Sequence, residues 1–385
     1  MNALSRNDKT AVGRWFWTID KLLLGLVLLL IGIGILAVAA ASPAAAHRYS
    51  GSGTSIDELH YLKRQIMWVL AGVPLMLGVS MLSIAWAKRV AIGLTIAFLF
   101  ALFLVPFFGF ETNGAVRWIQ LPGFQFQPSE FLKPVFIVTS AWLLSVRFDD
   151  KSMPTMQLSF GLLVIVASLL VKQPDIGQTA LFAAVWLVQA SLAGMSVAIV
   201  GGAIAAGAAG LATAYAFVPH VTSRIDRFIQ GTGDTYQIDR ALDCFKAGGL
   251  FGAGPGEGVM KFKLPEAQTD YIFAVIGEEF GAIACIALAV LYLGIVLRVL
   301  LQLLDEEEPF VFLAAAGLAT QFGLQAAINM SVNLNLMPSK GMTLPFVSHG
   351  GSSFLALSMG MGLLLALTRR NRFLKSSPYL GTARA

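Results

Sequence analysis

Charged residues are scarce in this sequence. Only 13% of its 385 residues are Asp, Glu, Lys or Arg, and 56% are hydrophobic, whereas soluble domains carry about 25% charged residues. Apolar runs of roughly 20 residues recur along the whole chain, which is the length that an α-helix needs to cross a bilayer. The composition therefore argues against a soluble protein with buried helices and predicts an all-α polytopic membrane protein.

Cysteine and histidine are also rare. The two cysteines, Cys244 and Cys285, do not suggest a disulfide framework. The four histidines have no spacing typical of zinc ligands, so no metal-ligating residue is assigned and a structural zinc site is not expected. The net charge is +5, but no basic stripe is interleaved with exposed aromatic residues, which argues against nucleic-acid binding.

The first apolar run has features of a secretory signal. Arg14 and Lys21 precede the apolar run, which covers residues 22–41, and the small residues SPAAA follow it. That run has roughly 20 residues, whereas the core of a signal peptide has about 7–15. We expect it to be retained as the first membrane span.

The hydropathy pattern predicts about ten transmembrane helices in a single domain over residues 1–385. The expected spans cover about 21–42, 64–86, 90–109, 129–146, 155–171, 175–192, 195–217, 270–300, 309–332 and 351–368. Residues 1–20 and 369–385 are expected as cytoplasmic tails, and 218–269 as a large periplasmic loop between spans seven and eight. Span seven contains GGAIAAGAAG, a small-residue surface suited to close helix packing.

The charges beside the spans give an orientation. Ten spans put both termini on one side, and the short loops of that side are rich in Lys and Arg, as cytoplasmic loops are. The opposite side also carries cations, mainly in the long loop: Arg117, Arg224, Arg227, Arg240, Lys246, Lys261 and Lys263. A bound anion is the simplest explanation for them. Lys246, Lys261 and Lys263 are therefore candidate substrate-binding residues.

Asp270 lies where span eight enters the membrane. The helix dipole there favours an ionised carboxyl, while burial raises the pKa of such a group. An Asp balanced between these effects can act as a general base. A helix-capping Asp is the structural alternative, which position alone favours.

Glu278 and Glu279 lie further along the same span, roughly 12 Å from Asp270 by the helical rise. Ionisable groups at membrane depth usually face a cavity or a partner. Adjacent residues on a helix point about 100° apart, so at most one of the two readily shares a site with Asp270. A buried, hydrogen-bonded strut and a functional role stay equally open.

The Gly-rich segment GGLFGAGPGEG precedes Asp270 in the chain. Glycines let main-chain amides approach a ligand closely, and successive amides bind anions. The segment lacks the GK[ST] ending of a nucleotide-binding P-loop. A plain flexible loop is the alternative interpretation.

Two pairs in and after the loop that follows span three could bind a substrate. Arg117 and Trp118 lie in that loop, and the planar fork of Arg suits pyrophosphate oxygens. Glu130 and Lys133 are three residues apart on span four and could simply pair with each other.

Polar residues also precede span ten. Lys340 adds a cation, and the run SHGGSS contains His349 and Ser352. This run lacks the GxSxG pattern of a nucleophile elbow, so a turn and helix entry is the alternative. We assign Lys340 and Ser352 as candidate substrate-binding residues. His349 and Asp175, the latter in the KQPD turn before span six, are assigned structural or cavity roles, as are both glutamates of span eight.

These segments together resemble the SEDS family of bacterial cell-wall proteins, named for shape, elongation, division and sporulation. The matches occur in family order from span three onward: NGAVRWI with QPSEFLK, KQPDIGQTA, GGLFGAGPGEG with LPEAQTDYIFAVIGEEFG, and NLNLMPSKGMTLPFVSHGGSS. PSKGMTLPF resembles the division branch more than the elongation branch. Gln268 replaces a usual His, His349 replaces a common Tyr, and Asp239 with Arg240 replaces a frequent Gln-Ser pair.

The resemblance implies a ten-span fold and a peptidoglycan glycosyltransferase that polymerises lipid II during septal wall synthesis. Asp270 falls on the position of the catalytic base, and Arg117, Glu130, Lys133 and Lys340 fall on cavity positions. The implied partners are a class B penicillin-binding transpeptidase and other division proteins of the bacterial cytoplasmic membrane. No nucleotide is expected, and a divalent cation, Mg or Mn, at the leaving pyrophosphate stays open.

Two other functions stay open. A lipid II flippase would use Glu278 and Glu279 to line a polar path across the membrane. A non-enzymatic scaffold for the division machinery would tolerate the loss of Asp270.

Overall fold

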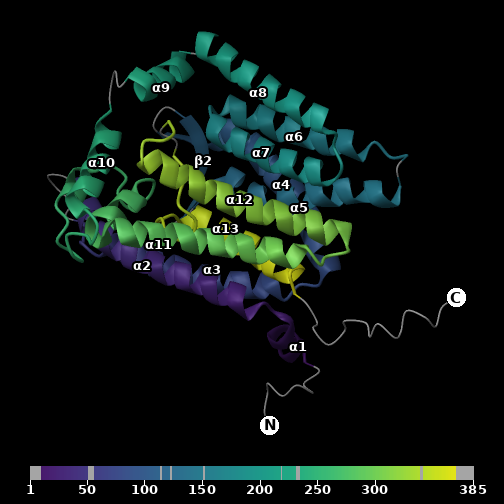
Figure 1. Cartoon of the computed structure of the whole chain (residues 1–385), viewed down its shortest axis with the longest axis horizontal. Coiled ribbons are helices and arrows are strands. Elements are labelled where there is room, and N and C mark those ends of the chain that lie inside the picture. The colour runs from purple at the N-terminus through teal and green to yellow at the C-terminus, as the bar shows by residue number, and fades with distance from the viewer. Residues whose placement is uncertain are drawn as a thin grey trace.

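The computed structural model describes residues 10–50, 56–112, 115–121, 124–150, 152–217, 219–230, 235–338 and 341–369. Most of this part of the chain is helical (Figure 1). The α-helices are α1 (Ala11–Thr18), α2 (Lys21–Tyr49), α3 (His60–Ser80), α4 (Ile84–Phe108), α5 (Pro128–Asp149), α6 (Thr155–Lys172), α7 (Ile176–Leu192), α8 (Val197–Phe217), α9 (Pro219–Gln230), α10 (Tyr236–Gly248), α11 (Ile272–Leu303), α12 (Pro309–Asn333) and α13 (Gly351–Leu367).

Ten of these helices correspond to the ten expected membrane spans. Eight are long and apolar enough to cross a membrane, namely α2, α3, α4, α5, α6, α8, α11 and α12. Helices α7 and α13 are apolar too and have 17 residues each. The predicted fold class, an all-α polytopic membrane protein, is confirmed.

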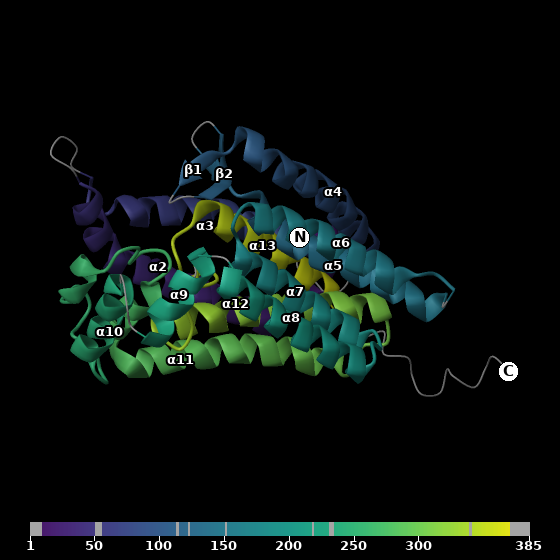
Figure 2. The ribbon, with the colours of Figure 1, turned by 90° about the horizontal axis from the view of Figure 1, so that it is seen from above.

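Three helices form the centre of the bundle. Most side chains of α5, α12 and α13 are buried, and α5 contacts both α12 and α13. Helices α4 and α11 lie on opposite edges in the view of Figure 2. We call the end that carries Asp270 and α10 the Asp270 end, and the end where α1 and Asp20 lie the Asp20 end.

Helix α8 lies along an edge of the bundle (Figure 1). Its described side chains are exposed along the helix, and a Cβ added at Gly201, Gly202, Gly207 or Gly210 would meet no atom within 4 Å. The small-residue surface of this span therefore does not pack closely against the rest of the described chain, and its suitability for close helix contact stays a prediction.

Two segments expected as loops contain regular structure. Residues 110–126 form a small antiparallel sheet of β1 (Phe110–Thr112), β2 (Ala115–Leu121) and β3 (Phe124–Phe126), in the order β1-β2-β3. The expected loop 218–269 holds α9, α10 and a short 3-10 helix, η1 (Met260–Lys263). Helices α9 and α10 are amphipathic, because polar and apolar residues recur in them at helical spacing. A hydropathy search for membrane spans therefore does not detect them.

Helix α11 is bent at Gly281, where φ is 81° and ψ is 176°. This conformation favours glycine. A Cβ at this position would also overlap the main chain of Leu250 and Gly252, because the Gly-rich segment packs directly against the bend.

An apolar groove of about 640 Å³ runs between α2 and α11. Its lining includes Leu29 and Leu36 of α2 and Phe280 and Leu291 of α11. Hydrogen bonds connect the two helices, or segments packed on them, at both ends of the bundle. Arg298 Nε lies 2.8 Å from Asp20 Oδ2 at one end. At the other end, Lys261 Nζ donates to Ala40 O at 3.0 Å.

Candidate functional site

Asp270 lies in a turn immediately before α11. The N-cap of that helix is Tyr271, and no side-chain capping hydrogen bond is present at its start. Asp270 is therefore not a helix cap in the described structure, which removes the alternative that its sequence position favours. Its side chain is partly exposed, unlike those of Glu278 and Glu279.

The surroundings of Asp270 raise its pKa to about 7. Enclosure by protein atoms is the largest cause, and the negative charges of Glu266 and Glu130 add to it. The opening on one side of Asp270 lets water screen these effects in part. A carboxyl with this pKa can hold or release a proton near neutral pH.

Glu266 is fixed beside Asp270 in a strained conformation. Its φ is 53°, in the left-handed region that residues with side chains rarely adopt. Tyr49 Oη donates to its Oε1 at 2.9 Å, and Thr269 Oγ1 donates to its Oε2 at 2.7 Å. Its negative charge is therefore held in place near Asp270.

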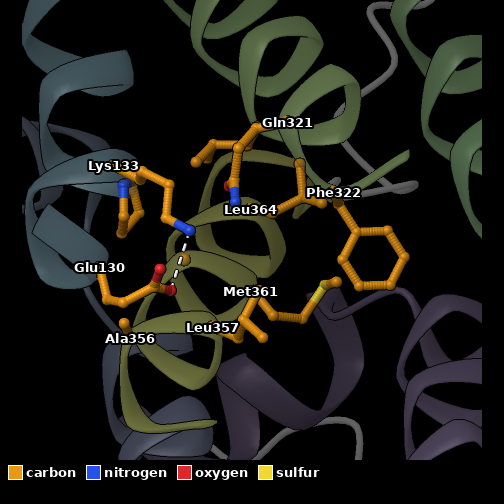
Figure 3. A pocket seen from close by; sticks show the side chains of 11 residues that line it. Glu130, Lys133, Gln321, Phe322, Ala356, Leu357, Met361 and Leu364 are labelled. Atoms are coloured by element: carbon orange, nitrogen blue, oxygen red, sulfur yellow. Dashed lines mark ion pairs between the residues drawn. The ribbon is translucent and has the colours of Figure 1, made fainter. Parts of the chain in front are cut away.

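Glu130 and Lys133 form a buried ion pair on the first turns of α5 (Figure 3), with 2.8 Å between Glu130 Oε2 and Lys133 Nζ. Gln178 Nε2 donates to Glu130 Oε1 at 2.7 Å, and Lys133 Nζ donates to Gln325 Oε1 at 3.1 Å. The pair lines a narrow pocket of about 10 Å³, which is room for about one water molecule. The expected pairing is present, with further partners on α7 and α12.

Four amide side chains follow one another at four-residue spacing on α12, and the sequence analysis did not single them out. They are Gln321, Gln325, Asn329 and Asn333, all buried, and we call them the amide stripe. Gln325 Nε2 donates to Thr343 O at 3.1 Å. Polar residues at i, i+4, i+8 and i+12 in an apolar helix lie on one face, and this pattern is the signal that could have identified them.

The amide stripe connects Glu130 and Lys133 to Asp270. Gln325 contacts Lys133, as described above, while Asn329 Nδ2 donates to Met342 O at 2.6 Å and to Asp270 O at 2.9 Å. The segment that contains Gly341 also approaches the carboxyl, because a Cβ on Gly341 would lie 3.2 Å from Asp270 Oδ2. Groups from α12 and the segment before α13 thus meet at Asp270, and Lys133 of α5 contacts the same amide stripe.

Arg117 is engaged by the turn before α7. Its Nη2 donates to Pro174 O at 2.8 Å and its Nε to Gln173 O at 3.3 Å, while Asp175 Oδ2 lies 3.8 Å from Nε. Trp118 is half-buried in β2. The expected Arg117 and Asp175 therefore meet at this turn.

Glu278 and Glu279 bind the chain's own amides. Glu278 accepts hydrogen bonds from Met260 N at 2.6 Å and Lys261 N at 2.8 Å, and Glu279 accepts one from Gly256 N. Lys261 Nζ pairs with Glu279 in a fully buried contact. The Lys261 ammonium and the Gly256 amide, which could serve a ligand, are thus already occupied by the Glu279 carboxylate.

The remaining candidate residues are dispersed. Lys246 is exposed, 3.9 Å from Asp243 Oδ1, and Lys263 is exposed on η1. Ser352 is buried in the first turn of α13, and His349 Nδ1 lies 3.1 Å from Gln65 Oε1. Lys340 lies outside the described residues.

In the described residues, no group of three or more His, Cys, Asp or Glu side chains is arranged to hold a metal ion.

A bundle of ten apolar helices with a half-open carboxyl at one end defines a polytopic membrane protein with a polar centre near one membrane face. The chain belongs to the cell cycle protein family of FtsW, RodA and SpoVE, whose profile matches residues 20–373. The resemblance to the SEDS family is confirmed.

Relatives in this family match along most of their length. One from Caulobacter vibrioides, named "Probable peptidoglycan glycosyltransferase FtsW", is 41% identical over 370 residues, which cover 96% of this chain and 94% of the relative. One of the same name from Geobacter sulfurreducens is 36% identical over 334 residues, covering 84% and 88%.

Solved structures share the fold. A chain from a structure titled "Structural coordination of polymerization and crosslinking by a peptidoglycan synthase complex" superposes with a TM-score of 0.73 at 26% identity, covering 91% of this chain and 97% of that one. The rod shape determining protein RodA of Thermus thermophilus superposes with a TM-score of 0.64 at 26% identity, covering 91% and 96%.

Proposed function

We propose that this chain is a peptidoglycan glycosyltransferase that polymerises lipid II for the septal cell wall. The observation that carries the proposal is Asp270, a partly open carboxyl with a pKa raised to about 7, beside the amide stripe, whose Gln325 contacts a buried Glu–Lys pair. The names of the FtsW relatives support the reaction class and the role in division.

In the proposed reaction, Asp270 accepts the proton from the 4-hydroxyl of the acceptor sugar. The oxygen then bonds to the anomeric carbon of the donor while the bond from that carbon to the lipid pyrophosphate breaks. Attack from the opposite face inverts the anomeric centre. A base with a pKa near the working pH suits this step, because it is ionised before the transfer and holds the proton afterwards.

Cations near the substrate would balance the charge of the leaving pyrophosphate. Lys133 is buried beside Glu130, and Arg117 is partly exposed. Lys246 and Lys263 are exposed at the same end. A divalent cation carried by the pyrophosphate stays a prediction, and no step of the proposal passes through one.

We propose that the Asp270 end faces the periplasm and that both termini are cytoplasmic. Support comes from the described basic residues at the Asp20 end, which flank short connections: Arg14, Lys21, Lys88, Arg89, Arg147 and Arg369. This orientation brings Asp270 to the side on which the wall is built. A septal location follows from the proposed role in division.

We propose a class B penicillin-binding transpeptidase as the partner. The structural neighbour from a peptidoglycan synthase complex supports a partner that crosslinks what this chain polymerises. Other division proteins of the membrane remain expected partners.

The flippase alternative is weaker on the described geometry. It needs Glu278 and Glu279 to line a path for a polar head group, but both carboxylates are buried and accept hydrogen bonds from residues 256–261. A scaffold without catalysis is separated from the enzyme by the experiment below.

The test is polymerisation of purified lipid II by the purified protein in detergent, with and without the class B transpeptidase, beside Asp270→Asn. We expect glycan chains from the wild type and none from the folded, partner-binding variant. Equal activity of the two would remove Asp270 from the chemistry. No activity of either, with the partner present, would reject the glycosyltransferase.

A further inference from the structure

The main chain of Asp270 is held by two side chains from another helix. Asn329 Nδ2 and Asn333 Nδ2 both donate to Asp270 O, each at 2.9 Å. A carbonyl oxygen has two lone pairs, so two such donors saturate it. This carbonyl is therefore held from α12 at the position where α11 begins.

Asn333 also replaces the missing cap of α11. Its Oδ1 accepts a hydrogen bond from Ala274 N at 3.1 Å, an amide of the first turn that also donates to Tyr271 O at 3.0 Å. Because α11 has no capping side chain of its own, Asn333 fixes its first turn from outside the helix. The start of α11 and the carbonyl of Asp270 are held by the same side chain.

The two asparagines support each other and the facing segment. Asn333 Nδ2 donates to Asn329 O at 2.9 Å, and Asn329 Nδ2 donates to Met342 O at 2.6 Å. Both side chains are buried, 2% and 0% exposed, so these bonds do not compete with solvent. Asn329 therefore joins Asp270 to the segment whose Gly341 faces the carboxyl.

We infer that Asn329 and Asn333 are positioning residues for Asp270: they fix its main chain, so that its carboxyl is aimed at the acceptor hydroxyl. This inference rests on the proposed glycosyltransferase function. Neither asparagine touches substrate, and both act through Asp270. A misplacement of about 1 Å in a reacting group can cost roughly 100-fold in rate, so loosening this carbonyl affects turnover more than binding.

Two replacements at position 333 separate the two roles of that side chain. Asn333→Leu removes both the donor to Asp270 O and the acceptor for Ala274 N. Asn333→Asp keeps an acceptor for Ala274 N and loses the donor. We expect kcat to fall about 10- to 100-fold in both variants, with KM within about twofold of the wild type. Both variants are expected to lower the unfolding temperature, Asn333→Asp because its carboxyl is buried against the carbonyl oxygens of Asp270 and Asn329.

Gln189→Leu is the matched control. Gln189 is also a fully buried amide, and its Nε2 donates to two main-chain carbonyls, Ile137 O at 3.0 Å and Leu313 O at 3.1 Å. It has no contact with Asp270. We expect this variant to lose stability, while kcat per folded molecule stays within about twofold.

The closing experiment measures steady-state lipid II polymerisation by wild type, Asn329→Leu, both Asn333 variants, Gln189→Leu and Asp270→Asn, each corrected for folded protein. A second measurement follows the modification of Asp270 by dicyclohexylcarbodiimide as a function of pH, located by peptide mass spectrometry. This reagent attacks protonated carboxyls, so the midpoint reports the protonation of Asp270 without any turnover. Glu266 on the same segment and Glu130 on α5 are the charged groups that raise this midpoint, and Lys133 is paired with Glu130.

The inference predicts a lower midpoint in Asn329→Leu and Asn333→Leu, because a loosened Asp270 is better solvated, and an unchanged midpoint in Gln189→Leu. Folded asparagine variants with wild-type kcat and wild-type midpoint would overturn it, as would a loss no larger than that of Gln189→Leu. If even the wild type fails to polymerise lipid II, the proposed function fails, and the modification midpoints still decide the positioning role.

Discussion

Two groups of carboxylates near the start of α11 differ in whether neighbouring groups occupy their side-chain oxygens. Glu278 and Glu279 are buried, and amides and Lys261 occupy their oxygens. Asp270 has the opposite arrangement, because its main-chain oxygen is saturated while its side chain is partly exposed. A carboxylate whose oxygens are all engaged stabilises a fold. An acidic residue that is held through its main-chain oxygen leaves its carboxyl available for a reaction.

The comparison also separates a carboxylate whose charge is compensated by a buried cation from a carboxyl whose pKa is raised. The buried pair of Lys261 and Glu279 persists because each ion has a partner, and removing one leaves the other uncompensated. Asp270 has two acidic neighbours instead, Glu266 and Glu130, which oppose its ionisation. The Lys261–Glu279 pair stabilises the fold, whereas Asp270 can exchange a proton near neutral pH.

The largest expected effect is the loss of activity in Asp270→Asn. A positioned general base contributes about 10²- to 10⁴-fold to a rate, so we expect polymerisation to fall by at least about 10²-fold. Stability should not fall, because a carboxyl with a raised folded-state pKa destabilises the fold when it is ionised. Lipid II polymerisation and thermal unfolding measure the two quantities, and a variant that melts earlier and keeps its turnover would reverse the assignment.

The second effect concerns the buried ion pair of Lys261 and Glu279. Glu279→Ala leaves Lys261 buried without its partner, which costs about 3–5 kcal/mol of unfolding free energy. Replacing both residues by Met removes both charges and should recover most of that loss. Thermal unfolding in detergent checks the pair of variants. If Glu279→Ala is as stable as the wild type, the contact does not fasten the Gly-rich segment.

The third effect uses two glycines of that segment with the same backbone conformation. Gly252 and Gly256 have φ of 87° and 88°, but only at Gly252 would a Cβ overlap the main chain of Glu279. Ala at position 256 should cost about 1 kcal/mol through strain alone. Ala at position 252 should cost clearly more, because the segment must also move away from α11. Equal unfolding temperatures of the two variants would mean that the close approach contributes nothing.

The smallest effect is a pH shift that sharpens the description of Asp270. Since the base must be ionised, activity should rise with pH through a midpoint near 7, the value to which its pKa is raised. Glu266→Gln removes a neighbouring negative charge, so the midpoint should move to lower pH, by about half a unit to one unit. Glu257→Gln, an exposed position in the Gly-rich segment, is the control. A midpoint unchanged by Glu266→Gln would mean that enclosure alone sets the pKa.

The membrane helices could be predicted closely because hydropathy alone defines them. Span four, expected at about 129–146, is observed as α5 (Pro128–Asp149), and span nine, expected at about 309–332, is observed as α12 (Pro309–Asn333). The sheet at residues 110–126 has strands of 3 to 7 residues, too short for a clear alternation. The bend at Gly281 lies inside a segment expected as one continuous span, because hydropathy does not distinguish a bent helix from a straight one.

The site was harder to predict because its contacts join distant segments. Glu130 and Lys133 are three residues apart, and their pairing follows from helical spacing. The pairing of Lys261 with Glu279 depends on how the Gly-rich segment packs back on α11, which no local pattern specifies. The amide stripe was visible as spacing on α12, but its partners, Asp270 and residues 342–343, become known only from the tertiary structure.

The groove between α2 and α11 has a further consequence. Contacts at both ends of the bundle join these helices: Arg298 bonds to Asp20 at one end, and Lys261 bonds to Ala40 at the other. Because α2 and α11 are joined at both ends, they cannot close the groove between their middle turns by tilting toward each other. A bilayer does not leave an apolar space of about 640 Å³ empty, so lipid chains or an apolar segment of a partner occupy it. The groove is thus a recess in the lipid-facing wall, with an ion pair at one end of its two helices and a hydrogen bond at the other.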